Sequence, residues 1–595
     1  MRRARILPIV VVAIAFIGFI AVGAGVGAAE SVAPSECGAD DGPEAVGCWN
    51  GTHHADELGF DQSDGLTDAE LEALTHLTMA RVEYIRERPF ERDVPVETVS
   101  RAEFMSGGAS GDTNGTANGS GEAYRRWNDQ VWEALFVVDD DQNANDAIEA
   151  VLGGAVGGFY SPTQDRIVIV VPEDETVQIS PSTLAHELVH AMQDQYHDLS
   201  DSRYVGETQD GDLAVNGIVE GEAVHIEERY AARCGTNWTC LDEPDGGGGG
   251  SGTQPNFGIL QTVLQPYSDG ALYVDALVAE DGWTAVNETM NDPPESTAEV
   301  IHRNPDYETR EIAYEDTATG GWETYPDQGV DGAETAGEAS MFVMFWYQSF
   351  AYEHAVLEPD ASVRENVRIH FETDEQLRTR TNYNYAHEVT AGWAGDELYP
   401  YRNGDRDGYV WVTEWQTRSD ARAFQAAYRR MLTAHGDAPF EAGEVYEIDD
   451  GGFEGAYGLV HESTTVTIVH APEPRGVLEL RPDADLSRST GDQNGGDNPF
   501  DDGDASNGDA TDGDGTGDDA TDGDTADGDA TDGDTGDAGG GSDTDDGLPS
   551  DSNDSPDGDG ASPDASVDRV PGFGALAALV GLLFAAFLAG RRSRR

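Results

Sequence analysis

The sequence predicts an α+β fold, with a first unit of mixed helices and strands, a smaller second unit, and a polar tail. Three features of the chain support this prediction. The apolar, β-branched run Arg166–Val171 ends at a proline and is typical of a strand. A helical pattern follows it at 183–194, and a second one spans 216–230. From residue 337 onward an aromatic-rich helix precedes strands and a further helix, which indicates a separate mixed layer.

The first unit, 60–310, begins with an amphipathic helix at 66–86, which a capping box from Thr67 to Glu70 opens. The other elements expected there are a strand at 94–101, a loop at 106–120, helices at 124–136, 144–152 and 270–280, and a glycine-rich loop at 234–253. The second unit, 311–485, is expected to be a smaller α+β domain with helices at 337–352 and 420–432 and strands at 409–415, 445–448 and 464–470. It carries no chemical motif, so a lid, a substrate platform and structural support all remain open.

The stretch His186-Glu187-Leu188-Val189-His190 carries the clearest chemical signal in the chain. Side chains four residues apart on a helix share one face, about 5–6 Å apart at Cβ, so His186 and His190 could bind one Zn²⁺. Glu187 could hold a metal-bound water and accept its proton. We therefore predict His186 and His190 as zinc ligands and Glu187 as the catalytic base.

A catalytic zinc needs a third protein ligand and an open position for water. The helical pattern at 216–230 offers Glu220 and Glu222. These two side chains lie about 200° apart on a helix, so only one of them can face the metal. Glu220 shares its face with small and apolar residues, whereas Glu222 lies nearer the polar side. The periodicity favours Glu220 slightly, and Glu222 remains open.

The HELVH motif followed by Glu220-Gly221-Glu222-Ala223 resembles the gluzincin arrangement of zinc metalloproteases, in which an E-G-x-A-like helix supplies a glutamate ligand. This resemblance implies a zincin-like catalytic domain, a mixed sheet with an active-site helix, over 60–310. It also implies that Glu220 is the third ligand. The separation of His190 from Glu220 is longer than in the thermolysin-type members of the group.

Other side chains near the motif fit a zinc site less well. His197 follows His190 by seven residues, which does not match the metzincin spacing, so a surface or supporting position is expected for it. Asp194 could orient His190, although an exposed acid at a helix end is the simpler interpretation. Nothing in the sequence places His225 or His302 near the zinc, and the predicted site includes neither.

The formal net charge of −81 and the complete absence of lysine indicate a protein built for concentrated salt. All 34 basic residues are arginine, which pairs with carboxylates in a planar fork and is weakly hydrated. The segment 492–568 holds 26 aspartates and no basic residue, which leaves a charge of about −55 on the rest. At molar salt the screening length is about 3 Å, so this self-repulsion largely disappears. Nucleic acid is excluded as a partner because its phosphates would be repelled.

The two ends of the chain predict export and anchoring. Arginines precede an apolar run and a small-residue cleavage site, which predicts a signal peptide at 1–29, by the general or the twin-arginine route, and an exported segment at 30–59. Residues 486–569, rich in Asp, Gly and Thr, cannot bury enough apolar surface to fold and are expected to form a disordered stalk. Residues 570–595 combine an apolar stretch with a basic end, as one membrane helix does.

The tail, which begins with Pro571-Gly572-Phe573, also resembles the PGF-CTERM sorting signal of haloarchaeal surface proteins. The resemblance implies that a membrane-embedded sorting enzyme cuts near the motif and attaches a lipid. A permanent transmembrane anchor is the alternative. Either outcome predicts an extracellular protein tethered to the membrane at the cell surface, where it could associate with the surface layer.

Four cysteines in an exported chain predict two disulfides, and Cys37 with Cys48 and Cys234 with Cys240 is the most economical of the three possible pairings. Surface glycans are expected at some of the sequons, which begin at Asn50, Asn114, Asn118, Asn237, Asn287 and Asn553.

Together these features predict a cell-surface zinc metallopeptidase that acts on a peptide or protein substrate. Zn²⁺ held by His186, His190 and Glu220 would polarise the scissile carbonyl. Glu187 would take the proton of the attacking water and deliver it to the leaving amine. Two alternatives remain: a non-catalytic surface binding or structural glycoprotein that retains the H-E-x-x-H helix, and a zinc hydrolase of non-peptide amides or esters.

Overall fold

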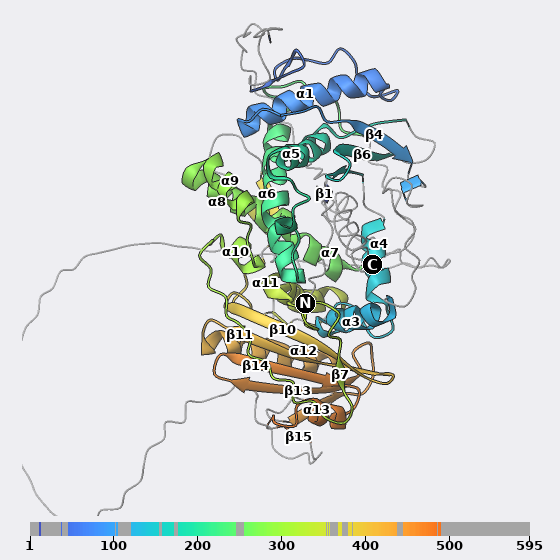
Figure 1. Cartoon of the computed structure of the whole chain (residues 1–595), viewed down its shortest axis with the longest axis vertical. Helices are drawn as coiled ribbons and strands as arrows, with labels where there is room; N and C mark the ends of the chain where they lie inside the picture. Colours follow the sequence, from blue (N-terminus) through green and yellow to red (C-terminus); the bar gives the residue numbers. More distant parts are fainter. Residues whose placement is uncertain are drawn as a thin grey trace, which may run out of the picture. The chain divides into compact units, whose positions relative to one another are not determined.

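The structure is a computed structural model of the chain (Figure 1). It describes residues 11–12, 37, 46–100, 103–104, 121–153, 157–171, 176–244, 255–352, 354, 356–357, 367–371, 379–383, 385–436, 444–484 and 486–488. The predicted signal peptide apart from Val11–Val12, most of the loop at 106–120, the glycine run, nearly all of the acidic stalk and the sorting segment lie outside these residues. So do the sequons at Asn114, Asn118 and Asn553. Among the helices described, none is long and apolar enough to cross a membrane.

A four-stranded mixed sheet lies beside the helix that carries the H-E-x-x-H motif. Its strand order is β1 (Val11–Val12), β5 (Gly158–Ser161), β6 (Arg166–Val171) and β4 (Val96–Ser100). Strand β6 pairs antiparallel with β5 and parallel with β4. The inner four residues of β6 are buried, because apolar side chains on both faces of a central strand pack against neighbouring layers. The predicted strand at this position is therefore present.

Three long helices lie near this sheet: α5 contacts β5 and β6, α1 contacts β4, and α5 contacts both of the other helices (Figure 1). They are α1 (Asp68–Arg86), α5 (Pro181–His197) and α6 (Gln209–Arg233). The capping box predicted for α1 is formed. Helix α5 begins at Pro181, and the hydroxyl of Ser180 accepts a hydrogen bond from the amide of Thr183. Helix α6 is buried over most of its length, so it runs through the interior instead of covering a surface.

A run of short helices follows α6. These are α7 (Phe257–Val263), the π-helix η2 (Pro266–Gly270), α8 (Ala271–Asp281), α9 (Trp283–Asn291) and α10 (Thr297–His302). All of them except α7 contact α6, whereas α7 packs against α11 (Gly337–Ala351) and α4 (Ala144–Gly153). Helix α6 and η2 meet backbone to backbone, because a Cβ atom placed on Gly221 would lie only 2.4 Å from the carbonyl carbon of Gly270. This close approach brings the side chains of η2 against the metal-binding face of α6.

The second unit is built on a seven-stranded sheet that is antiparallel apart from its β12–β15 edge pair (Figure 1). Its order is β15 (Ser487–Arg488), β12 (Glu444–Ile448), β13 (Gly455–Glu462), β14 (Thr465–Ala471), β11 (Arg406–Trp415), β10 (Trp393–Asn403) and β7 (Glu323–Thr324). The helices that contact this sheet are α11, α12 (Arg418–His435) and α13 (Pro474–Leu480), and from the first unit α3 (Gly121–Ala134). Helix α4 packs on α3 and α7.

The predicted α+β class is confirmed: a helical region with a mixed sheet holds the motif, and a separate antiparallel sheet follows. The smaller elements are two hairpins, β2 (Cys48–Trp49) with β3 (Thr52–His53) and β8 (Val367–Phe371) with β9 (Thr379–Tyr383), and the short helix η1 (Ser202–Tyr204). The disulfides Cys37–Cys48 and Cys234–Cys240 are both formed, so the predicted pairing is confirmed.

Candidate metal centre

Helices α5 and α6 bring three side chains to one point. His186 and His190 come from successive turns of α5, and Glu220 comes from the facing side of α6. Each offers one ligand atom, and these atoms all lie within 4.8 Å of one another. Glu220 Oε2 lies 3.1 Å from His186 Nε2 and 3.4 Å from His190 Nε2. Two imidazoles and a carboxylate are a donor set that suits a catalytic zinc.

The hydrogen bonding of the cluster leaves room for a cation. All three side chains have no exposed surface, yet His190 Nε2 and Glu220 Oε1 have no hydrogen-bond partner. Buried polar atoms are almost always paired, because an unpaired one costs about 1–3 kcal/mol. A cation bound among the three residues would satisfy both atoms. The residues therefore fit a metal ion, and among the described residues no other group of His, Cys, Asp and Glu has this geometry.

The protonation states also suit metal binding. Burial lowers the pKa of His186 to about 4 and that of His190 to about 3, so both imidazoles are neutral near pH 7 and can donate a lone pair. Burial raises the pKa of Glu220 to about 7, and hydrogen bonds from His186 and Tyr267 oppose that rise. A positive ion beside this carboxylate would favour its charged form.

Each histidine is oriented through its other ring nitrogen. His186 Nδ1 lies 2.9 Å from Glu227 Oε2, and His190 Nδ1 lies 2.9 Å from Gln193 Oε1. Because Glu227 and Gln193 present acceptors, they favour the tautomer with the proton on Nδ1, in which each Nε2 offers a lone pair to a metal. In this structure His186 Nε2 lies 3.1 Å from Glu220 Oε2. Gln193 is held in turn, since its amide nitrogen donates to Val219 O and to Glu222 Oε2, both at 2.9 Å.

Glu220 and Glu222, the two candidates for the third ligand, contact different partners. Glu220 faces the histidines, whereas Glu222 forms a buried ion pair with Arg86 and accepts from Gln193. The Arg86 guanidinium lies 4.1 Å from the ring centroid of Trp283. Glu222 therefore holds Gln193 in place, and Gln193 in turn orients His190. The structure brings Glu220, and not Glu222, to the two histidines.

Glu187 lies on the side of α5 that faces the sheet and is fully buried. Its Oε2 accepts a hydrogen bond of 2.9 Å from the backbone amide of Tyr160 in β5. The carboxylate predicted to act as the base is therefore fixed between the ligand helix and strand β5.

The other polar side chains of the motif region serve structural contacts. Asp194 is not the exposed acid that the sequence predicts, and it does not orient His190. It is buried, and it accepts hydrogen bonds from the Tyr160 hydroxyl at 2.8 Å and the Leu199 amide at 2.9 Å. His197 is buried near Arg88 and lies outside the metal-binding group.

His225 and His302 both lie outside the group of His186, His190 and Glu220. His225 Nδ1 lies 2.7 Å from Asp275 Oδ1 on α8, and His302 Nε2 lies 2.8 Å from Glu338 Oε2 on α11. Both histidines join helices of the interior.

Sequence reasoning missed three supporting residues, Glu227, Gln193 and Tyr267. Glu227 and Gln193 lie seven and three residues beyond their neighbours Glu220 and His190, so helical periodicity could have suggested them. Tyr267 lies on η2, and no sequence signal connects it to the motif. Its ring stacks on His186 with centroids 6.3 Å apart, and its hydroxyl bonds the Glu220 carboxylate.

The cluster is enclosed in the full chain. His186, Glu187, His190 and Glu220 each have 0% exposed surface. Strand β1, which belongs to the predicted signal peptide, pairs with Phe159 and Tyr160 of β5 and also contacts α5. This edge of β5 is therefore occupied by a segment that export is expected to remove.

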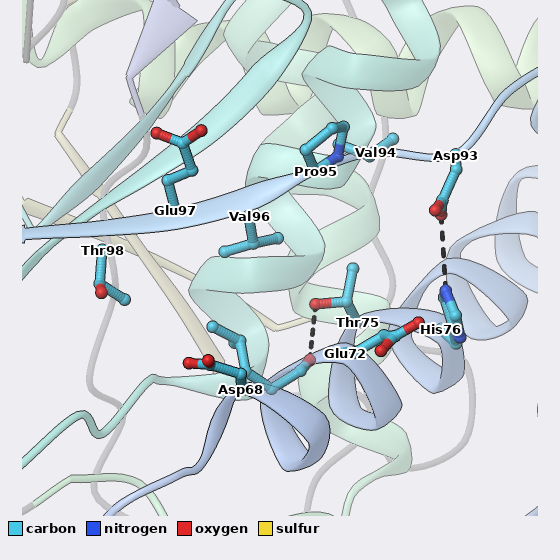
Figure 2. A pocket seen from close by; sticks show the side chains of 11 residues that line it. Asp68, Glu72, Thr75, His76, Asp93, Val94, Pro95, Val96, Glu97 and Thr98 are labelled. Carbon is cyan, nitrogen blue, oxygen red and sulfur yellow. Dashed lines mark hydrogen bonds and ion pairs between the residues drawn. The ribbon is translucent and has the colours of Figure 1, made fainter.

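A separate pocket of about 520 Å³ lies between α1 and β4 (Figure 2). Its polar lining includes Glu72, Asp93, Glu97 and His76, and His76 Nε2 lies 3.5 Å from Asp93 Oδ1. None of its lining residues belongs to the metal-binding group, and the acids are spread too widely to form a second one.

Two parts of the chain match known family models. Residues 570–592 match the PGF-CTERM motif, and residues 323–481 match a family described only as a domain of unknown function (DUF8575). No curated protein and no solved structure matches the chain. The motif confirms the predicted location: this is an archaeal cell-surface protein anchored to the membrane. The second match covers strand β7 to helix α13 and includes neither α5 nor α6.

Proposed function

We propose that the chain is a zinc-dependent metallopeptidase of the archaeal cell surface. The observation that carries this proposal is the convergence of His186, His190 and Glu220, with two unpaired buried atoms among them, at the helix that also carries Glu187. Hydrolysis of a peptide bond needs an activated water, a base and a place for the chain being cut. The region around α5 supports each of these.

The residues of the chain have separate roles in this proposed reaction. His186, His190 and Glu220 would hold a zinc ion, which when bound supplies a Lewis acid for the carbonyl and lowers the pKa of its water. Glu187 accepts the proton of the attacking water and returns it to the leaving amine. The amide of Tyr160, 2.9 Å from Glu187 Oε2, fixes the orientation of that carboxylate.

Strand β5 supports a peptide as the substrate. Its outer edge pairs antiparallel with Val11–Val12, so an extended chain fits there in the register Val11 to Tyr160 and Val12 to Phe159. Main-chain hydrogen bonds along such an edge hold a peptide without regard to most of its side chains. Because Tyr160 also contacts Glu187, a chain bound on β5 lies next to the proposed base. Access requires that the cover over the cluster be displaced or removed.

A closed structural metal site is the second candidate. The complete burial of His186, His190 and Glu220 favours it, because structural zinc sites are closed whereas catalytic ones keep an open position. In that case the metal would join α5 to α6 and the protein would be a non-catalytic envelope component.

The test compares the exported chain with its Glu187→Gln variant, both purified in concentrated salt. Zinc content and cleavage of a denatured protein mixture are measured for each. The proposal predicts equal zinc and a rate at least about 100-fold lower in the variant, since general-base catalysis contributes 10²–10⁴-fold. Glu72→Gln, on the exposed face of α1, is the matched control and should keep full activity. Zinc without cleavage in the parent chain would establish the structural site instead.

A further inference from the structure

The three sequons within the described residues lie in different surroundings. Asn237 lies in the loop closed by the Cys234–Cys240 disulfide and is exposed. Asn287 lies inside helix α9 and is half-buried. Asn50 occupies the turn of the β2–β3 hairpin, with its side-chain nitrogen 3.4 Å from His76 Nδ1. Asn237 and Asn287 differ most, because the first is exposed on a loop and the second is half-buried in a helix.

The Asn287 side chain already has a structural role. Its Oδ1 accepts from Arg86 Nη2 at 2.6 Å and from Arg88 Nη1 at 2.9 Å. Arg86 in turn pairs with Glu222, which supports the ligand His190 through Gln193. A glycan is bulky and strongly hydrated and needs an open surface. On Asn287 it would have to be attached to Nδ2 of a half-buried amide inside a helix, whose oxygen two guanidinium groups already hold.

The loop that carries Asn237 differs from this arrangement, because the Asn237 side chain is exposed. Its backbone is held firmly, because the amides of Asn237 and Trp238 both donate to Arg233 O at 2.9 Å. The Trp238 ring is buried beneath the loop, with the Arg81 guanidinium 4.9 Å from its centroid. Asn237 and Thr239 are exposed on the outer side. Both sequon residues are therefore exposed on a rigid support, and the Thr239 hydroxyl donates a hydrogen bond of 2.8 Å to Glu57 Oε1 at the surface.

We propose that Asn237 carries an N-linked glycan and that Asn287 does not. The donor is a lipid-phosphate-linked oligosaccharide. A bond forms between Asn237 Nδ2 and the anomeric carbon of the first sugar, and the anomeric C–O bond to the phosphate breaks. The lipid phosphate leaves, and Nδ2 loses one proton.

The position of this glycan gives it a protective use. Tyr84 is one of the few large apolar side chains that are strongly exposed in the described residues, at 45%. It stacks on His54 with centroids 3.9 Å apart, and the Trp238 ring lies 6.2 Å from each of the two. A bulky, hydrated glycan beside Tyr84 would shield its ring from contact with other molecules. A glycan on the neighbouring Asn237 covers this side of the loop.

The experiment is a peptide map of the full chain expressed in a halophilic archaeal host. Arginine-specific cleavage leaves 234–303 in one piece, so a protease that cuts after Asp and Glu is used to separate the two sequons. The expected result is a sugar-bearing peptide at Asn237 that disappears in Thr239→Ala and persists in the matched Thr239→Ser, with the Asn287 peptide unmodified throughout. An unmodified Asn237 peptide, or sugar on Asn287, overturns the proposal. Neither outcome bears on zinc binding or peptidase activity.

Discussion

Two buried carboxylates, Glu220 in the helical region and Asp396 in the antiparallel sheet, have nearly the same exposure and opposite surroundings. Glu220 is 0% exposed and Asp396 is 2% exposed. Asp396 accepts four hydrogen bonds, from the amides of Ala336 and Gly337 at 3.0 Å and from the indole nitrogens of Trp393 and Trp411 at 2.9 Å. Glu220 has one oxygen between two imidazoles and the other with no hydrogen-bond partner.

The difference shows that burial alone does not mark a functional carboxylate. The protein satisfies Asp396 completely, and this carboxylate caps the start of α11 from a neighbouring strand. Glu220 faces two neutral imidazoles and one of its oxygens has no hydrogen-bond partner, so a cation bound there could balance its charge. Satisfied acids hold the fold together, and unsatisfied ones indicate a ligand.

The largest effect is expected from replacing Glu220 by glutamine. The amide cannot supply a charged oxygen, so zinc affinity should fall by more than the roughly 10- to 100-fold typical of a supporting residue. Metal content after equilibrium dialysis measures this loss. Asp396→Asn is the matched change of a buried acid to an amide and should leave zinc binding intact. Equal zinc content in the two variants would show that Glu220 is no more important for zinc binding than Asp396.

The same Asp396→Asn variant should lose stability. Its new NH₂ group would face donors that now point at the carboxylate, and one broken buried network costs on the order of 2–4 kcal/mol. Denaturant unfolding in concentrated salt measures the change in the free energy of unfolding. A variant as stable as the parent would show that the four hydrogen bonds of Asp396 contribute little.

Glu227→Gln should weaken zinc binding less than Glu220→Gln does. The amide oxygen can still accept from His186 Nδ1, but the orienting charge is gone, so a loss of about 10-fold is expected. Competition with a chelator of known affinity gives the number. A variant that binds zinc as tightly as the parent would remove Glu227 from the site.

The smallest effect concerns pH. Burial raises the pKa of Asp210 to about 7, although hydrogen bonds from Thr297 oppose the rise. The folded state therefore binds this proton more tightly than the unfolded chain does. The resulting stabilisation is fully present below about pH 4 and is lost as the pH rises through about 7.

Asp210→Asn removes that titration and keeps an acceptor for Thr297. Between pH 5 and 7 the parent should lose stability relative to the variant by about 1 kcal/mol per pH unit. Thermal unfolding at several pH values, at constant salt, measures the difference. Parallel stability curves for the two proteins would contradict the raised pKa.

The sequence predicted the features that depend on local geometry. His186 and His190 share a face because helices repeat every 3.6 residues, and the run Arg166–Val171 could hardly be other than a strand. The choice between Glu220 and Glu222 was weak because α6 is buried on nearly every side, so an apolar face does not single out one direction. Tertiary contacts with Arg86 and the histidines make the difference.

Contacts across long stretches of sequence could not be predicted. Asp194 is buried because Tyr160, 34 residues earlier, donates to it. Strand β10 escaped detection because Gly395, Asp396 and Pro400 interrupt its pattern, although pairing with β11 along its whole length holds it in the sheet. Tyr267 reaches the cluster only because Gly221 lets η2 approach α6.

The central claim is that a zinc ion joins α5 to α6 with one coordination position free. X-ray absorption at the zinc edge of the exported protein, freshly purified in concentrated salt, tests it most directly. Two imidazole nitrogens, one carboxylate and one water oxygen are the coordination shell that we expect, with the carboxylate signal absent in Glu220→Gln. A protein without zinc, or a zinc whose four ligands all come from the chain, would contradict the claim.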